Sequence, residues 1–338
     1  MKKLFVFFSM MVVAAVVALN LTSCDKEPDP LPSPTVQILV DVDEADGYTV
    51  NITIQATDAA TYAWDYGDGN TSVESGNHTY TYEASGDYTV SVTVDNGEGL
   101  TASASESTTI VASVEEMIAG SGDDGKTWVI TQKEGSYAGK IGPGIVDNTV
   151  PVDVILLVDG VVEMFGLGSE YNDEFTFYKD GTFKINAQND QGLAGFLYGN
   201  VLDMVITPSA DILSLPLCAV PFSNVEDASW ELNYDDLVVS TYNEFKDPKV
   251  FEDVTFTFPE GDTDKVAELK LSEGAYIGFA DLDYPAIPQL GIDAPVDNSV
   301  YIIKEVTPDM MQISIGISGV VEYAVYPTFF LTLIFEPK

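Results

Sequence analysis

Aromatic residues beside polar turn residues are the side chains of this sequence best suited to binding a sugar. The face of such a ring contacts the C–H groups of a pyranose, and nearby carboxylates and amides hydrogen-bond to its hydroxyls. The candidate ligand-binding residues are Trp230, Tyr234, Tyr171, Tyr284 and Asp173, and Tyr326 stands in a similar setting. The four aromatic candidates border turns and not apolar runs, so they are the first rings to test as sugar platforms. For each ring, packing in the core is the favoured interpretation.

Few residues are suited to proton transfer or to phosphate chemistry. The chain has one histidine, His78, and no arginine, which disfavours a Ser–His pair and an arginine clamp on phosphate. Glycoside hydrolysis needs only two carboxylates about 5–10 Å apart. The neighbours Asp173 and Glu174 do not form such a pair, because adjacent residues of a strand point to opposite faces. We therefore expect no catalytic residue and no cofactor; a two-carboxylate glycoside hydrolase is the less favoured alternative.

Metal and thiol chemistry is also sparse in the sequence. No His/Cys spacing typical of zinc sites occurs. Residues 41–47, Asp-Val-Asp-Glu-Ala-Asp-Gly, resemble a calcium loop, but the third acid comes one residue late, which favours an acidic hairpin turn. Cys218 lies in an apolar run and is expected to be a small buried residue. We predict no metal site.

The start of the chain predicts a secretory signal that is cleaved before a lipidated cysteine. Two lysines at positions 2 and 3 precede an apolar run over residues 4–19, and Leu-Thr-Ser then leads to Cys24. This is the bacterial lipobox pattern, in which Cys24 receives the lipid. An uncleaved anchor helix is the alternative. Residues 1–23 are thus the predicted signal peptide, and the proline-rich residues 24–34 are a predicted extended tether.

The charge of the chain is strongly negative. Asp and Glu number 54 against 14 Lys and Arg, which gives a formal net charge of −40 at pH 7. Such a field repels nucleic acid and anionic lipid, and it disfavours acidic polysaccharides as ligands. An acidic surface that only confers solubility is the alternative explanation. We expect no nucleic-acid partner, and any glycan ligand is expected to be neutral.

Short alternating strands separated by Gly, Asp and Asn turns predict an all-β protein with two domains. One short helix is expected over 113–119, because Ser113 and Glu116 have the spacing of a capping box and Gly120 can end the helix. The first β domain is predicted over 35–112. The short helix and a linker occupy 113–125, and a second β domain covers 126–338.

The first domain carries three motifs between two alternating strands, over 48–54 and 88–94. They are Trp-Asp-Tyr-Gly-Asp-Gly from Trp64, His-Thr-Tyr from His78, and Gly-Asp-Tyr-Thr-Val from Gly86. In this order the motifs resemble those of the PKD domain, an immunoglobulin-like β-sandwich. The resemblance implies a spacer or interaction module of extracellular proteins, with Trp64 in the core and His78 in a structural role.

The second domain shows many more short strands. Alternating runs over 174–178 and 182–185 flank Asp180-Gly181, a strong hairpin signal, and Trp128 is expected in the core. Residues 329–335 form a nearly continuous apolar run typical of a buried strand. We predict a β-sandwich or jelly roll, with a lipocalin-like barrel as the alternative.

Three stretches of this domain, 126–128, 168–183 and 269–278, give a second resemblance. They resemble the domain that follows PKD modules in surface glycan-binding lipoproteins of Bacteroidota polysaccharide-utilisation systems. In that family the segment after the first strand is rich in tryptophan, whereas residues 135–168 contain none. The resemblance implies capture of a neutral glycan and its transfer to an outer-membrane transporter.

The residues after Cys24 help to predict the cellular location of the protein. Asp25-Lys26-Glu27 resembles the surface-export signal of Bacteroidota lipoproteins. We therefore expect a lipid-anchored protein of the outer membrane, at the cell surface. A structural or adhesive surface lipoprotein that binds no sugar is the main alternative.

Overall fold

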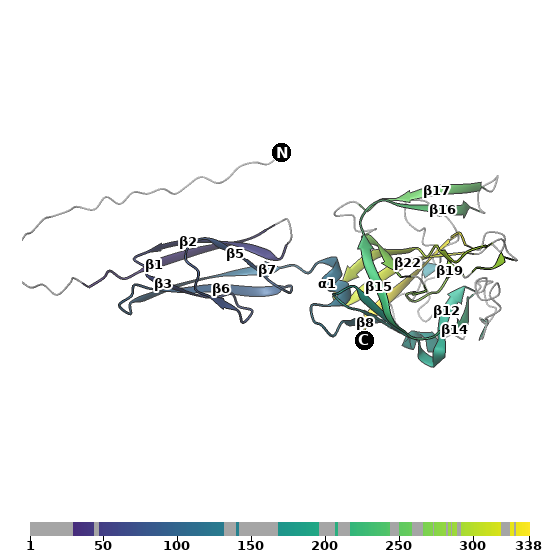
Figure 1. Ribbon diagram of the computed structural model, residues 1–338, viewed down its shortest axis with the longest axis horizontal. Helices are drawn as coiled ribbons and strands as arrows, with labels where there is room; N and C mark the ends of the chain where they lie inside the picture. The colour runs from purple at the N-terminus through teal and green to yellow at the C-terminus, as the bar shows by residue number, and fades with distance from the viewer. Residues whose placement is uncertain are drawn as a thin grey trace, which may run out of the picture. The chain divides into compact units, whose positions relative to one another are not determined.

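The computed structural model of the protein describes residues 30–43, 47–131, 140–141, 168–195, 207–208, 217–243, 250–258, 266–272, 274–281, 283–284, 286–288, 292–318, 325–327 and 329–338. Regular structure in these ranges is nearly all strand, which confirms the all-β prediction (Figure 1). Among them, no helix has the length and apolar character needed to cross a bilayer. The predicted signal peptide and Cys24 lie outside the described residues.

The N-terminal domain consists of two antiparallel sheets, as a sandwich requires. Its strands are β1 (Thr35–Val42), β2 (Thr49–Thr57), β3 (Thr61–Asp65), β4 (Thr71–Ser72), β5 (His78–Thr81), β6 (Gly86–Asp95) and β7 (Thr101–Ile110). One sheet has the order β1-β2-β5 and the other β4-β3-β6-β7. Alternation along β6 buries Val90, Val92 and Val94, and the register places Trp64 opposite Val92.

Two aspartates fix the turn that follows β3. Asp65 accepts a hydrogen bond from the backbone N–H of Gly67 at 2.9 Å, and Asp68 accepts one from Asn70 at 2.9 Å. Gly67 has φ of 84°, a left-handed conformation that glycine adopts without strain. Trp64 is buried, as predicted, and its Nε1–H donates to the carbonyl of Glu74 at 2.9 Å. The carboxylates of this motif thus act as turn residues.

The end of the predicted tether is held by the N-terminal domain. The backbone N–H of Leu31 donates to Glu98 Oε2 at 3.1 Å, and Asn96 Nδ2 donates to the carbonyl of Pro32 at 3.2 Å. Asn96 is itself buried and bonds the backbone of the β6–β7 turn. Residues 30–34 therefore lie along this turn.

A short helix, α1 (Val114–Ala119), opens the C-terminal domain. Ser113 Oγ accepts from the N–H of Glu116 at 3.1 Å, and the N–H of Gly120 donates to the carbonyl of Glu116 at 2.8 Å. The predicted cap and stop are both present. Ile118 is buried in the core, and its carbonyl accepts from Trp128 Nε1 at 2.8 Å.

Eight strands of the C-terminal domain close into a barrel. They are β8 (Lys126–Ile130), β10 (Glu174–Phe177), β11 (Thr182–Asn186), β15 (Val225–Asn233), β18 (Ala267–Leu271), β21 (Tyr301–Thr307), β22 (Met310–Ile317) and β23 (Phe329–Pro337). Each strand pairs antiparallel with the next, and β23 pairs with β8. The predicted β domain is confirmed, and its closed strand order matches the barrel alternative.

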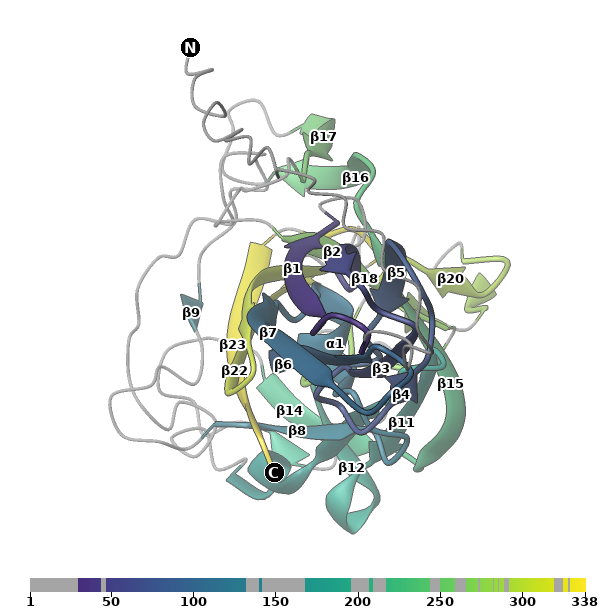
Figure 2. The ribbon, with the colours of Figure 1, turned by 90° about the vertical axis from the view of Figure 1, so that its left-hand side faces the viewer.

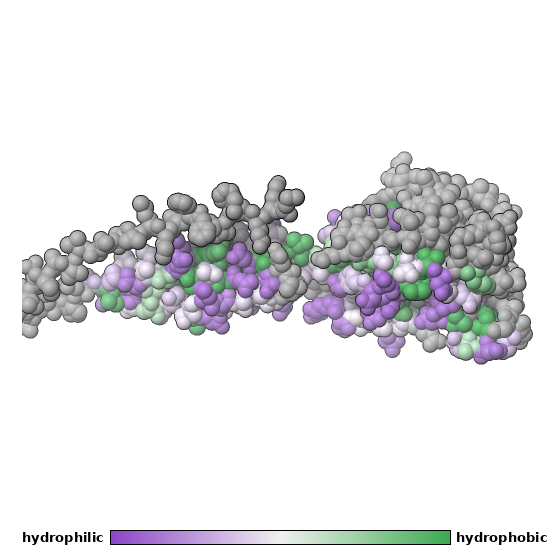
Figure 3. All heavy atoms as spheres, turned by 90° about the horizontal axis from the view of Figure 1, so that it is seen from above, coloured by the Kyte–Doolittle hydropathy of each residue, from purple (hydrophilic) through white to green (hydrophobic). Residues whose placement is uncertain are grey.

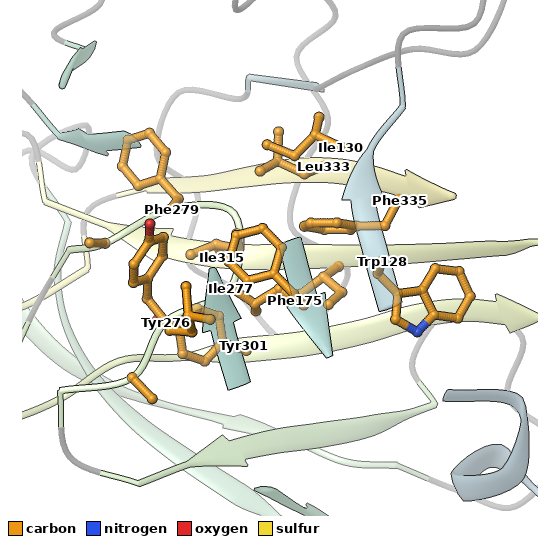
Figure 4. Close-up of a cluster of buried hydrophobic side chains, with 14 of the residues drawn as sticks. Trp128, Ile130, Phe175, Tyr276, Ile277, Phe279, Tyr301, Ile315, Leu333 and Phe335 are labelled. Carbon is orange, nitrogen blue, oxygen red and sulfur yellow. The ribbon is translucent and has the colours of Figure 1, made fainter. Parts of the chain in front are cut away.

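A buried loop fills the interior of this barrel. Residues 274–281 lie between β18 and β19 (Asp283–Tyr284) along the chain, and Tyr276, Ile277 and Phe279 lie among barrel side chains such as Phe335 (Figure 4). Gly278 has φ of +68°, and a Cβ there would lie 2.7 Å from atoms of Leu333 and Phe335. The ring of strands is thus a packed core, as expected for eight strands.

Smaller elements surround the barrel. They are β9 (Lys140–Ile141), β12 (Gln191–Gly195), β13 (Thr207–Pro208), β14 (Leu217–Pro221), β16 (Leu237–Asn243), β17 (Val250–Phe256), β19 (Asp283–Tyr284), β20 (Val296–Asp297) and the 3-10 helices Gly168–Asn172 and Gln188–Asp190. Cys218 is buried in β14, as predicted. The β16–β17 hairpin stands apart from β15 and β22 in two views (Figures 1 and 2).

The hairpin has one covered face and one exposed face. Val239 and Phe256 pack with Val300, Ile302 and Phe330 in a core of their own. On the other side, Val238 is 60% exposed and Phe251 is 50% exposed. Elsewhere hydrophilic and hydrophobic residues are interspersed on the face that Figure 3 shows. The hairpin therefore offers exposed apolar groups beside the barrel.

Candidate functional site

A two-stranded ribbon, β19–β20, forms one border of the candidate site. Its register pairs Tyr284 with Val296 and Asp283 with Asp297. Tyr284 is buried in a small apolar cluster with Val296 and Val325. Because successive residues of a strand point to opposite sides, the ribbon turns its two aspartates away from this cluster.

Two adjoining cavities lie beside the ribbon. Their volumes are about 360 Å³ and about 200 Å³. Glu268, Asp297 and Ser299 line both of them, and we call the pair of cavities the ribbon groove. Asp283 lines the smaller cavity and Tyr326 the larger.

An aromatic pair marks the hairpin side of the ribbon groove. The rings of Phe251 and Tyr326 meet edge to face, with centroids 5.2 Å apart and planes at 72°. Tyr326 is partly exposed, as is Phe251. Exposed rings next to a polar cavity are the arrangement that a sugar needs for stacking.

The polar side chains of the groove are held in place by hydrogen bonds. Asn298 Nδ2 donates to the carbonyl of Val325 at 2.8 Å, which fixes the orientation of its carboxamide. Ser299 Oγ donates to the carbonyl of Asp281 at 3.1 Å. Glu268 accepts from Asn233 Nδ2 at 2.7 Å and lies 3.9 Å from Lys270 Nζ. The groove therefore presents oriented amide, hydroxyl and carboxylate groups.

One carboxyl group of the ribbon has a displaced pKa. Burial raises the pKa of Asp283 to about 7, against the effect of its hydrogen bonds with Ser299, and the charge of Asp297 raises it further. The backbone N–H of Ser299 donates to Asp283 Oδ1 at 3.2 Å. Burial, followed by the Asp283 charge, also holds the pKa of Tyr301 well above its usual value. A displaced pKa in a cleft is typical of functional sites, although ion pairs in purely structural positions also produce it.

Comparison with known proteins identifies the N-terminal domain. The sequence profile of the PKD domain matches residues 32–111. This sandwich is a PKD domain. The match overlaps the predicted span of 35–112, and His78 stands at the start of β5 opposite Ile52.

Three solved structures are similar to the chain. The PKD1 domain of Vibrio anguillarum Epp is 27% identical over 25% of this chain and 100% of its own, with a TM-score of 0.22. The PKD1 domain of the Vibrio cholerae metalloprotease PrtV is 25% identical over 24% of this chain and 100% of its own, also with a TM-score of 0.22. A carbohydrate-binding module of the β-sandwich superfamily is 11% identical, over 92% of this chain and 93% of its own, with a TM-score of 0.24. No curated protein matches the chain.

Three of the four predicted aromatic residues are buried. Trp230 lies in β15, edge to face with Phe177 at 5.2 Å, and its Nε1–H donates to the carbonyl of Tyr178 at 2.9 Å. Tyr171 is only 4% exposed, and Tyr284 belongs to the apolar cluster behind the ribbon. Core packing, the favoured interpretation for these rings, is what the structure shows, because the protein itself covers the faces that a sugar would need.

Tyr234 and Asp173 take different positions. Tyr234 is 47% exposed, and its hydroxyl donates to Glu115 Oε1 at 3.0 Å. Burial of the hydroxyl and the Glu115 charge raise the pKa of Tyr234. Asp173 is buried and accepts from the backbone N–H of Gln188 at 2.8 Å. The predicted residues therefore do not form one site, and Tyr284 alone touches the surroundings of the ribbon groove.

A larger cavity, of about 670 Å³, lies near Tyr171. Asn172, Gln188, Glu336 and Lys338 contribute polar groups to its wall. Lys338 forms an ion pair with Glu174, and the Tyr171 ring is almost wholly covered. Of the predicted ligand-binding residues, Tyr171 lines this cavity, and its ring is too well covered to stack on a sugar.

Sequence reasoning missed most residues of the ribbon groove. Phe251 stands in an ordinary strand pattern, and Asp283 and Asp297 lie in strands of two residues each. Among these residues, only Tyr326 had a local sequence signal for sugar binding, namely an aromatic ring beside a proline. For metals, the described part of the chain holds no group of three or more His, Cys, Asp or Glu side chains placed to bind an ion. Residues 44–46 of the acidic 41–47 loop are outside it.

Proposed function

We propose that this protein is a lipid-anchored cell-surface protein whose barrel domain binds a neutral glycan in the ribbon groove. The observation that carries the proposal is the combination of partly exposed rings, Phe251 and Tyr326, with a cavity lined by hydroxyl, amide and carboxylate groups. The PKD domain serves as a spacer, in keeping with its β-sandwich fold.

Stacking supplies the apolar part of the binding. A pyranose ring laid against Phe251 or Tyr326 would cover apolar area that is now exposed to water, which is favourable. Tyr326 lines the groove and Phe251 contacts its ring, so a sugar stacked on either ring can reach the polar wall. The expected affinity is micromolar or weaker, about −8 kcal/mol, because the site is shallow and open.

Hydrogen bonds supply the orientation. Ser240, Asn298 and Ser299 offer hydroxyl and amide groups, and Asp297 and Glu268 accept hydrogen bonds from sugar hydroxyls. The two cavities of the groove are lined by three carboxyl groups, Glu268, Asp283 and Asp297. The lysine that lines the smaller cavity, Lys270, pairs with Glu268, so a uronate or sulfate ester would meet net repulsion. A neutral glycan is therefore the preferred ligand class.

The anchor and the transfer step complete the proposal. The lipobox at Cys24 and the charged residues after it favour attachment at the outer face of the outer membrane. Weak, open binding suits a protein that releases its ligand to a neighbouring transporter, since slow dissociation would hinder transfer.

Affinity electrophoresis and calorimetry of the full chain test the proposal. The probes are the neutral polysaccharides laminarin, xyloglucan, galactomannan and dextran, with polygalacturonate as the acidic comparison. We expect at least one neutral polymer to bind and polygalacturonate not to bind. Phe251→Ala and Tyr326→Ala should each weaken binding about tenfold, equivalent to ~1.4 kcal/mol.

Tyr234→Ala is the matched control, because Tyr234 is exposed to nearly the same degree as Phe251, but its hydroxyl bonds Glu115, whereas Phe251 contacts the ring of Tyr326 in the groove wall. It should leave affinity unchanged. Absence of binding by every polymer at millimolar sugar would refute the proposal and favour a structural or adhesive protein. If Tyr234→Ala loses binding and the two groove variants do not, the glycan site lies outside the ribbon groove.

A further inference from the structure

The β19–β20 ribbon contains an electrostatic conflict. Asp283 and Asp297 occupy directly opposite positions, and each strand is only two residues long. Like charges directly opposite each other destabilise a sheet, and so short a ribbon has little stability of its own. With both carboxyls ionised, the ribbon would be pushed apart at its centre.

The surrounding groups do not neutralise this conflict. Glu268 and Lys270 of β18 line the same cavity, but Lys270 is close to Glu268 and pairs with it at 3.9 Å. Tyr301 of β21 adds a neutral phenol, and Asp281, which precedes the ribbon, adds another acid. The Ser299 N–H is a neutral donor to Asp283. Acidic groups therefore outnumber the single lysine around the pair.

One proton removes the conflict. A proton held between two carboxyls converts their repulsion into a hydrogen bond, and such a pair titrates as a unit. Burial, with the charge of Asp297, raises the pKa of Asp283 to about 7. The ribbon is therefore expected to change protonation near neutral pH.

We propose that Asp283 and Asp297 form a proton-sharing pair that holds the β19–β20 ribbon closed when protonated and loosens it when both carboxyls ionise. The consequence for ligands rests on the proposed function: Asp297 lines both cavities of the ribbon groove, so glycan capture weakens as the ribbon loosens at higher pH.

The direction of the effect on stability follows from the displaced pKa. Asp283 binds its proton more tightly in the folded chain than an unperturbed aspartate does, whose pKa is 3.8. The stabilisation from the protonated pair is complete below about pH 4 and is lost as the pH rises to about 7. Asp283→Asn, which keeps the shape and cannot ionise, should flatten this part of the pH profile of the melting temperature.

A carboxyl titration of the full chain tests the pair directly. With ¹³C-labelled aspartate, one carboxyl resonance should titrate near pH 7 in the wild type and be missing in Asp283→Asn. Asp297→Asn should shift that titration to lower pH, because the like charge is gone. Asp293→Asn is the matched control, since Asp293 is an exposed acid shortly before β20 and outside the groove. No aspartate titration between pH 6 and 8, or its persistence in Asp283→Asn, overturns the proposal.

Hydrogen exchange tests the loosening. Amide exchange over residues 283–299 is compared between wild type and Asp283→Asn at pH 6 and at pH 8, so that the intrinsic pH dependence of exchange cancels. At pH 8 molecules with the ionised pair should outnumber those with the protonated pair about tenfold. The wild type should therefore lose protection from amide exchange at this pH, and Asp283→Asn should not. If the ratio of the wild-type exchange rate to the Asp283→Asn exchange rate is the same at both pH values, the proposal is contradicted.

Binding of the polysaccharide panel separates the two proposals. If a polymer binds, its affinity should fall about tenfold from pH 6 to pH 8 in the wild type and remain constant in Asp283→Asn. A titrating pair without any polymer bound would refute the proposed function and leave the proton-sharing pair standing. A bound polymer with equal affinity at both pH values would refute the link between ribbon and capture.

Discussion

Trp230 and Tyr234 are close in sequence, yet the first ring is buried and the second is exposed. Trp230 is in phase with Ala228 along β15, and both point to the interior of the barrel. Tyr234 follows the last residue of that strand, where alternation no longer directs the side chain. Proximity to a turn made both residues candidates for sugar binding, whereas strand phase, which the sequence also contains, separates them.

Trp64 is a residue whose burial the local sequence does predict. Trp64→Ala should destabilise the PKD domain by about 3–5 kcal/mol, the cost of emptying an aromatic core site. The loss of its hydrogen bond to the Glu74 carbonyl adds to this cost. Denaturant unfolding followed by circular dichroism measures the change. Val73→Ala, at an 80% exposed position of the same domain, should unfold like the wild type; equal stability of both variants would place Trp64 outside the core.

At the scale of elements, hairpins and caps were predictable because their signals are local. Asp180 accepts from the Thr182 N–H at 2.9 Å in the turn expected there, and Ser113 caps the expected helix. The ribbon groove was not predictable. It depends on the register of two-residue strands and on loops brought together by the barrel, neither of which leaves a periodic pattern.

The loop inside the barrel gives a sharp test of packing at this scale. Gly278→Ala should lower the melting temperature strongly, because the new Cβ would lie 2.7 Å from Leu333 and Phe335 in the core. Gly274→Ala is the matched control: its φ of +80° is similarly left-handed, but no atom lies within 4 Å of its Cβ. The control should therefore show only the backbone cost, about 1 kcal/mol. Equal effects of both changes would mean that the loop is not packed as described.

At the scale of the whole molecule, the proposed lipid anchor would decide where the groove works. Cys24→Ala should yield unlipidated protein that leaves the membrane fraction, because one side chain carries the predicted attachment. Cell fractionation and immunoblotting measure this, with Cys218→Ala as the control cysteine that should remain in the membrane fraction. Protease treatment of intact cells then tests surface exposure; full protection would contradict display on the outer face.

The pairing of β23 with β8 also sets an order of events during synthesis and export. The Lys338 N–H bonds the carbonyl of Thr127 at 3.0 Å, so the last strand seals a ring that the first strand began more than two hundred residues earlier. Until β23 has emerged, β8 and β22 each present an open edge, and such non-local pairing forms slowly. If the chain is exported as we propose, the barrel stays unsealed during its passage across the membrane, and folding is completed only after β23 has crossed.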